Sequence, residues 1–168
     1  MTISLYQVSV PIYVRQLHSL SAIIQKAIEH CAERKIDPAA LLNARLYPDM
    51  FPLTHQVRFA CNHAERGICR LNGMEPPTRE NNEATLEDLV TRIATAIAFI
   101  KSADAKKMVG MEDRDITFPV GENKMTLKGL DYLFQFSMPN FYFHVTTTYS
   151  ILRHNGLKIG KQDFLGGQ

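Results

Sequence analysis

A histidine and a threonine stand four residues apart in an otherwise apolar stretch near the C-terminal end of the sequence. His144 and Thr148 lie within residues 130–155, where large apolar side chains recur at the spacing of one helix face. Residues four apart on a helix stand one above the other, so the imidazole and the hydroxyl should share the face that points into a protein core. The apolar residues of this face are Leu130, Leu133, Phe134, Phe141, Val145, Ile151 and Leu152. A core imidazole in such a place either completes a structural hydrogen bond or ligates a metal.

Metal ligation needs nitrogen or oxygen donors that converge from different helices and leave room for water. His144 is the one histidine whose periodicity places it inside, and His63 is the best second donor because it lies on the flank of an earlier amphipathic helix. His55, nearer the opposite face of that helix, or Thr148 would be a poorer third contact. Two imidazoles share one ion only when their nitrogens come within about 3 to 3.5 Å of each other. The ion such a site would hold is divalent: Zn, Ni or Mn.

The sequence shows no motif for a cysteine nucleophile, a phosphate-binding loop or a pair of catalytic carboxylates. The three cysteines, Cys31, Cys61 and Cys69, form no CxxC spacing and no local nucleophile–base signature, so they are interpreted as small residues at the edge of the core. No glycine-rich loop opens a helix to hold phosphate. The glutamates are predicted to lie on outer or flanking surfaces, which excludes a pair of inward carboxylates; those considered are Glu29, Glu33, Glu65 and Glu87.

Composition limits the class of protein. The 168 residues, 45% hydrophobic and 21% charged, suffice for one sizeable core, so we expect a single domain over residues 1–168. The 19 basic and 17 acidic side chains leave a formal charge of +2 without a basic face, which argues against nucleic acid as a partner. No secretory signal and no run of 18 apolar residues is present, so we expect a soluble cytoplasmic protein with no membrane partner.

Hydrophobic periodicity predicts an all-α protein. A heptad-like seam from Tyr6 to Cys31 indicates a first long helix, and Pro11 should kink it or mark where its regular part starts. Thr85 and Asp88 resemble a capping box at the start of the third helix. Alternating residues around a Gly-Glu-Asn turn predict a small β-hairpin before the fourth helix. The expected helices span residues 5–34, 53–72, 86–102 and 130–155, and the hairpin spans 115–127.

These elements predict an antiparallel four-helix bundle with a small hairpin before the fourth helix. The long connections between the helices leave the handedness and the spatial order of the helices open. One of them, residues 75–84, is polar and proline-rich and shows no period.

Several short segments give the chain a family resemblance that covers nearly its whole length. They are residues 50–54 (MFPLT), 139–147 (PNFYFHVTT), 152–156 (LRHNG) and 160–166 (GKQDFLG). Together they resemble a bacterial family of domains of unknown function that is similar to the DinB/YfiT-like group of four-helix bundles. The C-terminal third carries the most specific part of this resemblance.

The resemblance implies a metal site and a dimer. Better studied members of the group bind a divalent metal through a histidine of the second helix and an HxxxH pair on the fourth; some are thiol-dependent transferases or isomerases, and dimers are common. His144 matches the first histidine of that pair, whereas Thr148 stands where the second is expected, and His63 matches the second-helix ligand only by its mid-helix position.

Two functional hypotheses follow. The first is a non-catalytic or small-ligand-binding bundle, a homodimer with a degenerate metal site in which His144 is a buried hydrogen-bonding residue. The alternative is a divalent-metal-dependent enzyme of the thiol transferase or isomerase type, in which His63 and His144 hold the ion together with Thr148, His55 or water.

Overall fold

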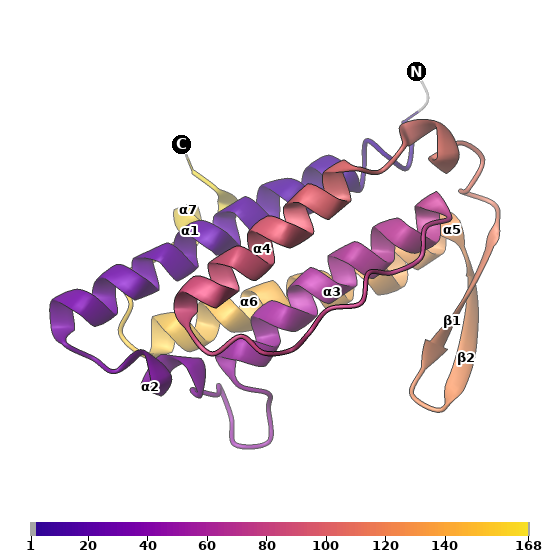
Figure 1. Cartoon of the computed structure of the whole chain (residues 1–168). Helices are drawn as coiled ribbons and strands as arrows, with labels where there is room; N and C mark the ends of the chain where they lie inside the picture. The colour runs from indigo at the N-terminus through magenta and orange to yellow at the C-terminus, as the bar shows by residue number, and fades with distance from the viewer. Residues whose placement is uncertain (1–2, 168) are drawn as a thin grey trace.

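The long helices of the protein follow the periodic segments of the sequence. The computed structural model describes residues 3–167, and its long helices are α1 (Val10–Arg34), α3 (Leu53–Asn72), α4 (Leu86–Lys101) and α6 (Met138–His154) (Figure 1). Tyr6 lies before α1 and is partly buried, whereas the predicted seam is buried along the helix itself, at Val10, Tyr13, Leu17, Leu20, Ile24, Ala27 and Cys31. The protein is therefore mainly helical, as predicted.

Local sequence signals set where these helices begin and end. Pro11 lies in the first turn of α1 and marks its start rather than a kink. Proline is tolerated there because the backbone N–H that it lacks would have no hydrogen-bond partner within the helix. At α4, the Asp88 amide donates to Thr85 Oγ1 at 3.0 Å and the Thr85 amide donates to Asp88 Oδ2 at 2.9 Å, which confirms the capping box. Gly73 ends α3 with φ of 64°, a left-handed conformation that glycine adopts without steric cost.

The helices do not run antiparallel throughout. Asn62 and Glu65 of α3 contact Arg92 of α4, and Asn72 contacts Asp104 just after α4, so α3 and α4 run in the same direction. The reason is the connection of residues 73–85, which returns along the length of α3 before α4 begins (Figure 1). The pairs α1–α4 and α3–α6 are antiparallel neighbours.

Short elements complete the chain. The predicted hairpin is confirmed: β1 (Asp115–Val120) pairs antiparallel with β2 (Asn123–Lys128) in a register that places Phe118 opposite Met125. Ile116 and Phe118 point into the core, while β2 is largely exposed. The remaining elements are α2 (Pro38–Leu42), η1 (Ala105–Met108), α5 (Gly129–Asp131), η2 (Tyr132–Ser137) and α7 (Lys161–Leu165).

A π-helical stretch precedes α6 and corrects the predicted core face. Residues of η2 form wider turns than an α-helix, because Pro139 lacks an N–H and its ring would clash with the carbonyl of residue 135. The wider turn rotates the earlier residues: Leu130 and Phe134 are 45% and 48% exposed, whereas Tyr132 and Leu133 are buried. Later in the predicted face, Phe141, Val145 and Thr148 are buried as expected.

Among residues 3–167, none of the helices has both the length and the apolar character needed to cross a membrane.

Candidate functional site

His63 and His144 meet across the seam between α3 and α6. Their rings are stacked, with centroids 5.4 Å apart and planes inclined by 17°. Both side chains are partly buried. Phe59 contacts the His144 ring and Phe136 contacts the His63 ring, at centroid distances of 5.1 and 6.4 Å. The structure thus brings together the two histidines that the sequence offered as donors, in a largely aromatic setting.

Gln56 fixes the orientation of His144. The Gln56 side-chain nitrogen donates to the Phe51 carbonyl at 2.9 Å, which directs the amide oxygen Oε1 toward His144 Nδ1, 2.8 Å away. Because an amide oxygen only accepts, Nδ1 must carry the proton and donate it. In the neutral ring the lone pair is then on Nε2, so His144 presents an acceptor at its other nitrogen.

Burial keeps both imidazoles neutral. It lowers the pKa of His144 to about 4 and, together with repulsion from His144, Arg66 and Arg70, lowers the pKa of His63 to about 4 as well. A protonated ring would lose its hydration, and positive charge on His144 would repel a protonated His63. The site is therefore a pair of uncharged rings at neutral pH, able to accept hydrogen bonds or to ligate.

Thr148 lies one turn from His144 and is fully buried. Its hydroxyl proton is donated to the His144 carbonyl at 2.9 Å, within the same helix. A neutral hydroxyl is a poor substitute for an imidazole, since divalent metals in proteins are held by histidine, cysteine and carboxylates. Within residues 3–167, no three side chains of the His, Cys, Asp and Glu types are placed to hold one ion. The residues present do not fit a three-imidazole metal centre.

His55 lies away from the stacked pair. It precedes His63 by eight residues, two turns or about 12 Å along α3, and Phe59 stands between them. Its ring stacks on Phe51 with centroids 5.6 Å apart. Burial lowers its pKa, with Arg58 and Arg45 adding to the effect, and its buried Nδ1 has no hydrogen-bond partner among the described residues. His55 and His63 could not contact one ion in this conformation.

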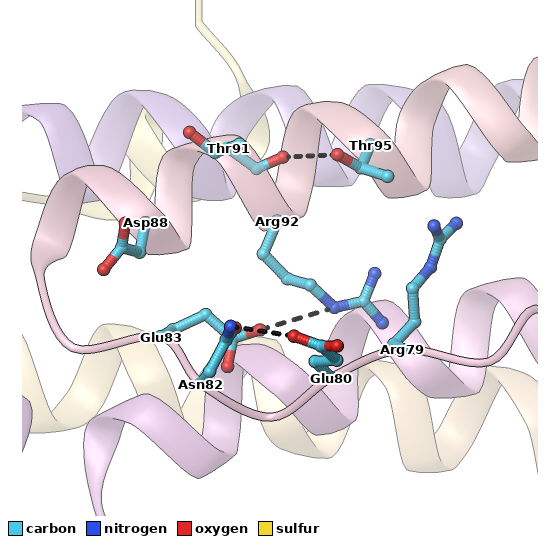
Figure 2. A pocket seen from close by; sticks show the side chains of 8 residues that line it. All are labelled: Arg79, Glu80, Asn82, Glu83, Asp88, Thr91, Arg92 and Thr95. Carbon is cyan, nitrogen blue, oxygen red and sulfur yellow. Dashed lines mark hydrogen bonds and ion pairs between the residues drawn. The ribbon is translucent and has the colours of Figure 1, made fainter.

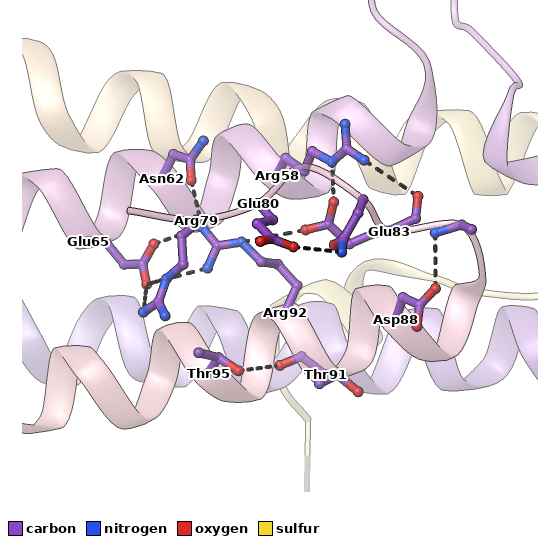
Figure 3. A network of polar contacts seen from close by, with 12 residues as sticks. Arg58, Asn62, Glu65, Arg79, Glu80, Glu83, Asp88, Thr91, Arg92 and Thr95 are labelled. Carbon is purple, nitrogen blue, oxygen red and sulfur yellow. Dashed lines mark hydrogen bonds and ion pairs between the residues drawn. The ribbon is translucent and has the colours of Figure 1, made fainter. Parts of the chain in front are cut away.

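A second polar cluster lies where α3, α4 and the 73–85 connection meet (Figure 3). Glu65 is only 2% exposed and accepts from Arg92 and Arg79, each at 2.7 Å, which corrects the prediction that it lies on an outer or flanking surface. Buried charges are tolerated when they are paired and hydrogen-bonded, and the two guanidinium groups supply that pairing. Arg58 pairs with Glu83 in the same way.

Sequence reasoning missed Gln56, Arg92 and the pairing of Glu65. A signal existed for Glu65, because it stands four residues from both Cys61 and Cys69 on one stripe of α3, and all three are buried. Arg92 lies beside Ile93 on the apolar face of α4. No sequence pattern predicted that Glu65 and Arg92 form an ion pair, because the two residues are distant in the chain.

Comparison with known proteins identifies the fold and the family of this chain. A crystal structure described as a DinB family member protein from Shewanella denitrificans is 36% identical in sequence and superposes with a TM-score of 0.91, over 98% of this chain and 93% of that one. The fold is thus that of the DinB-like proteins. The model of the family described as "Domain of unknown function (DUF1993)" matches residues 5–165, so the chain belongs to this family within the DinB-like group. No curated protein matches it.

Proposed function

We propose that this protein is a non-catalytic DinB-like bundle that binds a small ligand at the His63–His144 pair. The observation that carries the proposal is the stacked pair of neutral imidazoles, with His144 held by Gln56 and with Thr148 where a third imidazole would be needed. Nε2 of His144 offers an acceptor, and the rings of Phe59 and Phe136 offer apolar contact. The ligand that suits these groups has a hydrogen-bond donor on an apolar body.

Phenol is a simple probe with both features. We expect it to shift the side-chain NMR signals of His63 and His144 saturably, and to lose this effect in His144→Ala. His18→Ala is the matched control, because His18 is exposed on α1 and should leave the titration unchanged. Equal binding by His144→Ala, or no saturable shift at the two rings, would contradict the proposal.

One observation favours the alternative, a divalent-metal-dependent enzyme of the thiol transferase or isomerase type. A carbonyl oxygen on Nδ1 of His144 is the arrangement that orients many metal-bound histidines. Elemental analysis after dialysis against Zn, Ni or Mn separates the two ideas. We expect less than about a tenth of an equivalent to be retained at micromolar free metal, because only two imidazoles are present. Stoichiometric retention that disappears in both His63→Ala and His144→Ala would favour the enzyme instead.

At the level of the whole chain, we propose that α1, α3, α4 and α6 form one four-helix bundle domain that associates as a homodimer. One contiguous apolar core, to which all these helices contribute, supports a single domain. A reducing, cytoplasmic location is part of the same proposal and is supported by three buried free thiols: Cys31, Cys61 and Cys69.

A further inference from the structure

A small polar cavity lies between α3 and the 73–85 connection. Its volume is about 100 Å³, which gives room for a few water molecules or for one small oxyanion. The residues that line it are Asn62, Glu65 and Arg66 of α3 and Pro76, Pro77, Arg79 and Asn81 of the connection. Glu65 and Arg66 follow Asn62 by three and four positions, so these three side chains share one face of the helix.

An ion-pair network borders this cavity and carries unbalanced positive charge (Figure 3). Its members alternate in sign along a chain of ion pairs, in the order Arg58, Glu83, Arg92, Glu65 and Arg79. Three guanidinium groups therefore share two carboxylates, which leaves one positive charge in excess. Arg79, at the end of this chain, lines the cavity. Its Nε and Nη2 donate to Glu65 at 3.2 and 2.7 Å, whereas its Nη1 has no hydrogen bond among residues 3–167.

Arg66 adds a second unbalanced positive charge. It is exposed on α3, lines the same cavity and forms no ion pair within the described part of the chain. Glu80, another carboxylate of the connection, lines the separate groove toward α4, where it accepts from Asn82 at 3.1 Å (Figure 2). Because two cationic side chains border one cavity, an anion between them is favoured.

Asn62 presents hydrogen-bond donors to the same cavity. Its Oδ1 accepts from Arg92 Nη2. Because a guanidinium group only donates, this bond fixes the orientation of the amide, with its oxygen toward Arg92 and Nδ2 directed away (Figure 3). The Nδ2 hydrogens have no acceptor among the described residues, and Asn62 is only partly buried, so a ligand can reach them. Asn81, exposed on the connection, supplies a further amide.

The number and the placement of these donors favour a phosphate group over a carboxylate. Donors stand on both walls of the cavity, on α3 and on the connection. A carboxylate has two oxygens in one plane, whereas a phosphate group presents three acceptor oxygens in different directions. Guanidinium groups match the geometry of phosphate through pairs of N–H donors. Two unbalanced positive charges also match the charge of a phosphate group, which approaches −2 above neutral pH.

We propose that this cavity binds a phosphate group, either inorganic phosphate or the phosphate of a small monoester, through Arg66, Arg79 and Asn62. None of the residues that line it belongs to the His63–His144 pair. The site is therefore tested independently of the function proposed above.

The test is an NMR titration of the full chain with inorganic phosphate at about pH 8, where the anion is largely doubly charged. Sodium chloride keeps the ionic strength constant, so that general screening does not change along the titration. The reporters are the backbone signals of residues 62–66 and, in the wild type, the side-chain amide of Asn62. We expect these signals to shift saturably. Methyl phosphate, titrated in the same way, distinguishes the sources: binding of the monoester alone indicates a phosphorylated small molecule, and binding of inorganic phosphate alone indicates the free anion.

Two variants separate ligand binding from a structural role. Asn62→Asp keeps an oxygen that accepts from Arg92 but replaces the Nδ2 donors by a second carboxylate oxygen. A purely structural Asn62 would tolerate this change, whereas phosphate binding should weaken by at least about tenfold. Arg66→Gln removes an exposed charge without breaking an ion pair of the described residues, and it should also weaken binding about tenfold. Circular dichroism checks that both variants remain folded.

Arg34→Gln is the matched control, because it removes the same charge from an exposed position on α1, beside a different surface cavity. It should leave the titration unchanged. The proposal is overturned if neither inorganic phosphate nor methyl phosphate shifts the reporter signals saturably. It is also overturned if either Asn62→Asp or Arg66→Gln binds like the wild type, or if acetate at the same concentration shifts the signals as strongly as phosphate does.

Discussion

At the scale of single residues, His63 and His144 show how burial changes an imidazole. In the folded protein both have a pKa of about 4, whereas an unfolded histidine titrates near 6.5. As the pH falls from about 6.5 to 4, the unfolded chain binds protons that the folded protein does not bind. The contribution of these two histidines to the free energy of unfolding is therefore fully present above pH 6.5 and is lost as the pH falls toward 4.

We predict that the free energy of unfolding decreases by about 2 kcal/mol between pH 7 and pH 4.5, after discounting for partial exposure of the rings. Urea unfolding at a series of pH values measures it. The variant His63→Gln/His144→Gln should flatten this dependence, although His55, whose pKa is lowered too, will preserve part of it. His18→Gln should leave the dependence intact. A double variant as pH-sensitive as the wild type would assign the effect to other groups.

At the scale of elements, Gly67 sets how closely α3 approaches the start of α6. A Cβ at this position would lie 2.3 Å from Ser137 Oγ and 3.2 Å from the Tyr13 hydroxyl, two groups joined by a buried hydrogen bond of 2.8 Å. In a helix, alanine is otherwise preferred over glycine by about 1 kcal/mol. The close contact should outweigh this preference, because the neighbouring groups are buried and hydrogen-bonded.

We predict that Gly67→Ala destabilises the protein by about 2 kcal/mol, through overpacking and disruption of the Tyr13–Ser137 bond. Thermal and urea unfolding measure the change. Ser137→Ala removes the atom that the new methyl group would meet, so Gly67→Ala/Ser137→Ala should cost less than the sum of the single changes. Additive losses would show that the contact with Ser137 is not the cause.

At the scale of the whole molecule, exposed aromatic side chains lie beside the α3–α6 seam. Phe51 and Phe143 are 54% and 56% exposed, and their rings adjoin those of His55 and His144. Large exposed apolar patches mark surfaces where proteins associate, and we propose that these two rings are part of such a patch. It gives the expected homodimer a location that can be tested.

We predict that Phe51→Ser and Phe143→Ser each shift the protein toward the monomer, by at least about tenfold in dissociation constant. Sedimentation velocity over a range of concentrations measures this. Val109→Ser, which removes an exposed apolar side chain elsewhere in the fold, is the control and should leave association unchanged. A wild-type protein that is monomeric at every concentration would rule out the dimer.

Elements with local signals could be predicted from the amino-acid sequence. Helix periodicity, the Thr85–Asp88 capping box and the glycine at position 73 all act within a few residues, so they placed α3, α4 and the hairpin closely; α1 was placed correctly at its end, but it begins at Val10 and not at residue 5. Helical spacing likewise predicted an inner position for His144 and a flanking position for His63, and both side chains are partly buried in the structure.

Features that depend on contacts between distant segments could not be predicted from local patterns. The direction of α4 follows from how residues 73–85 pack along α3, and loop length alone does not specify it. The outward rotation of Leu130 and Phe134 follows from the π-helical turn before Pro139, and the burial of Glu65 depends on arginines 14 and 27 residues away. The stacking of His63 on His144 and the bond from His144 to Gln56, 88 residues apart, exist only once α3 and α6 pack together.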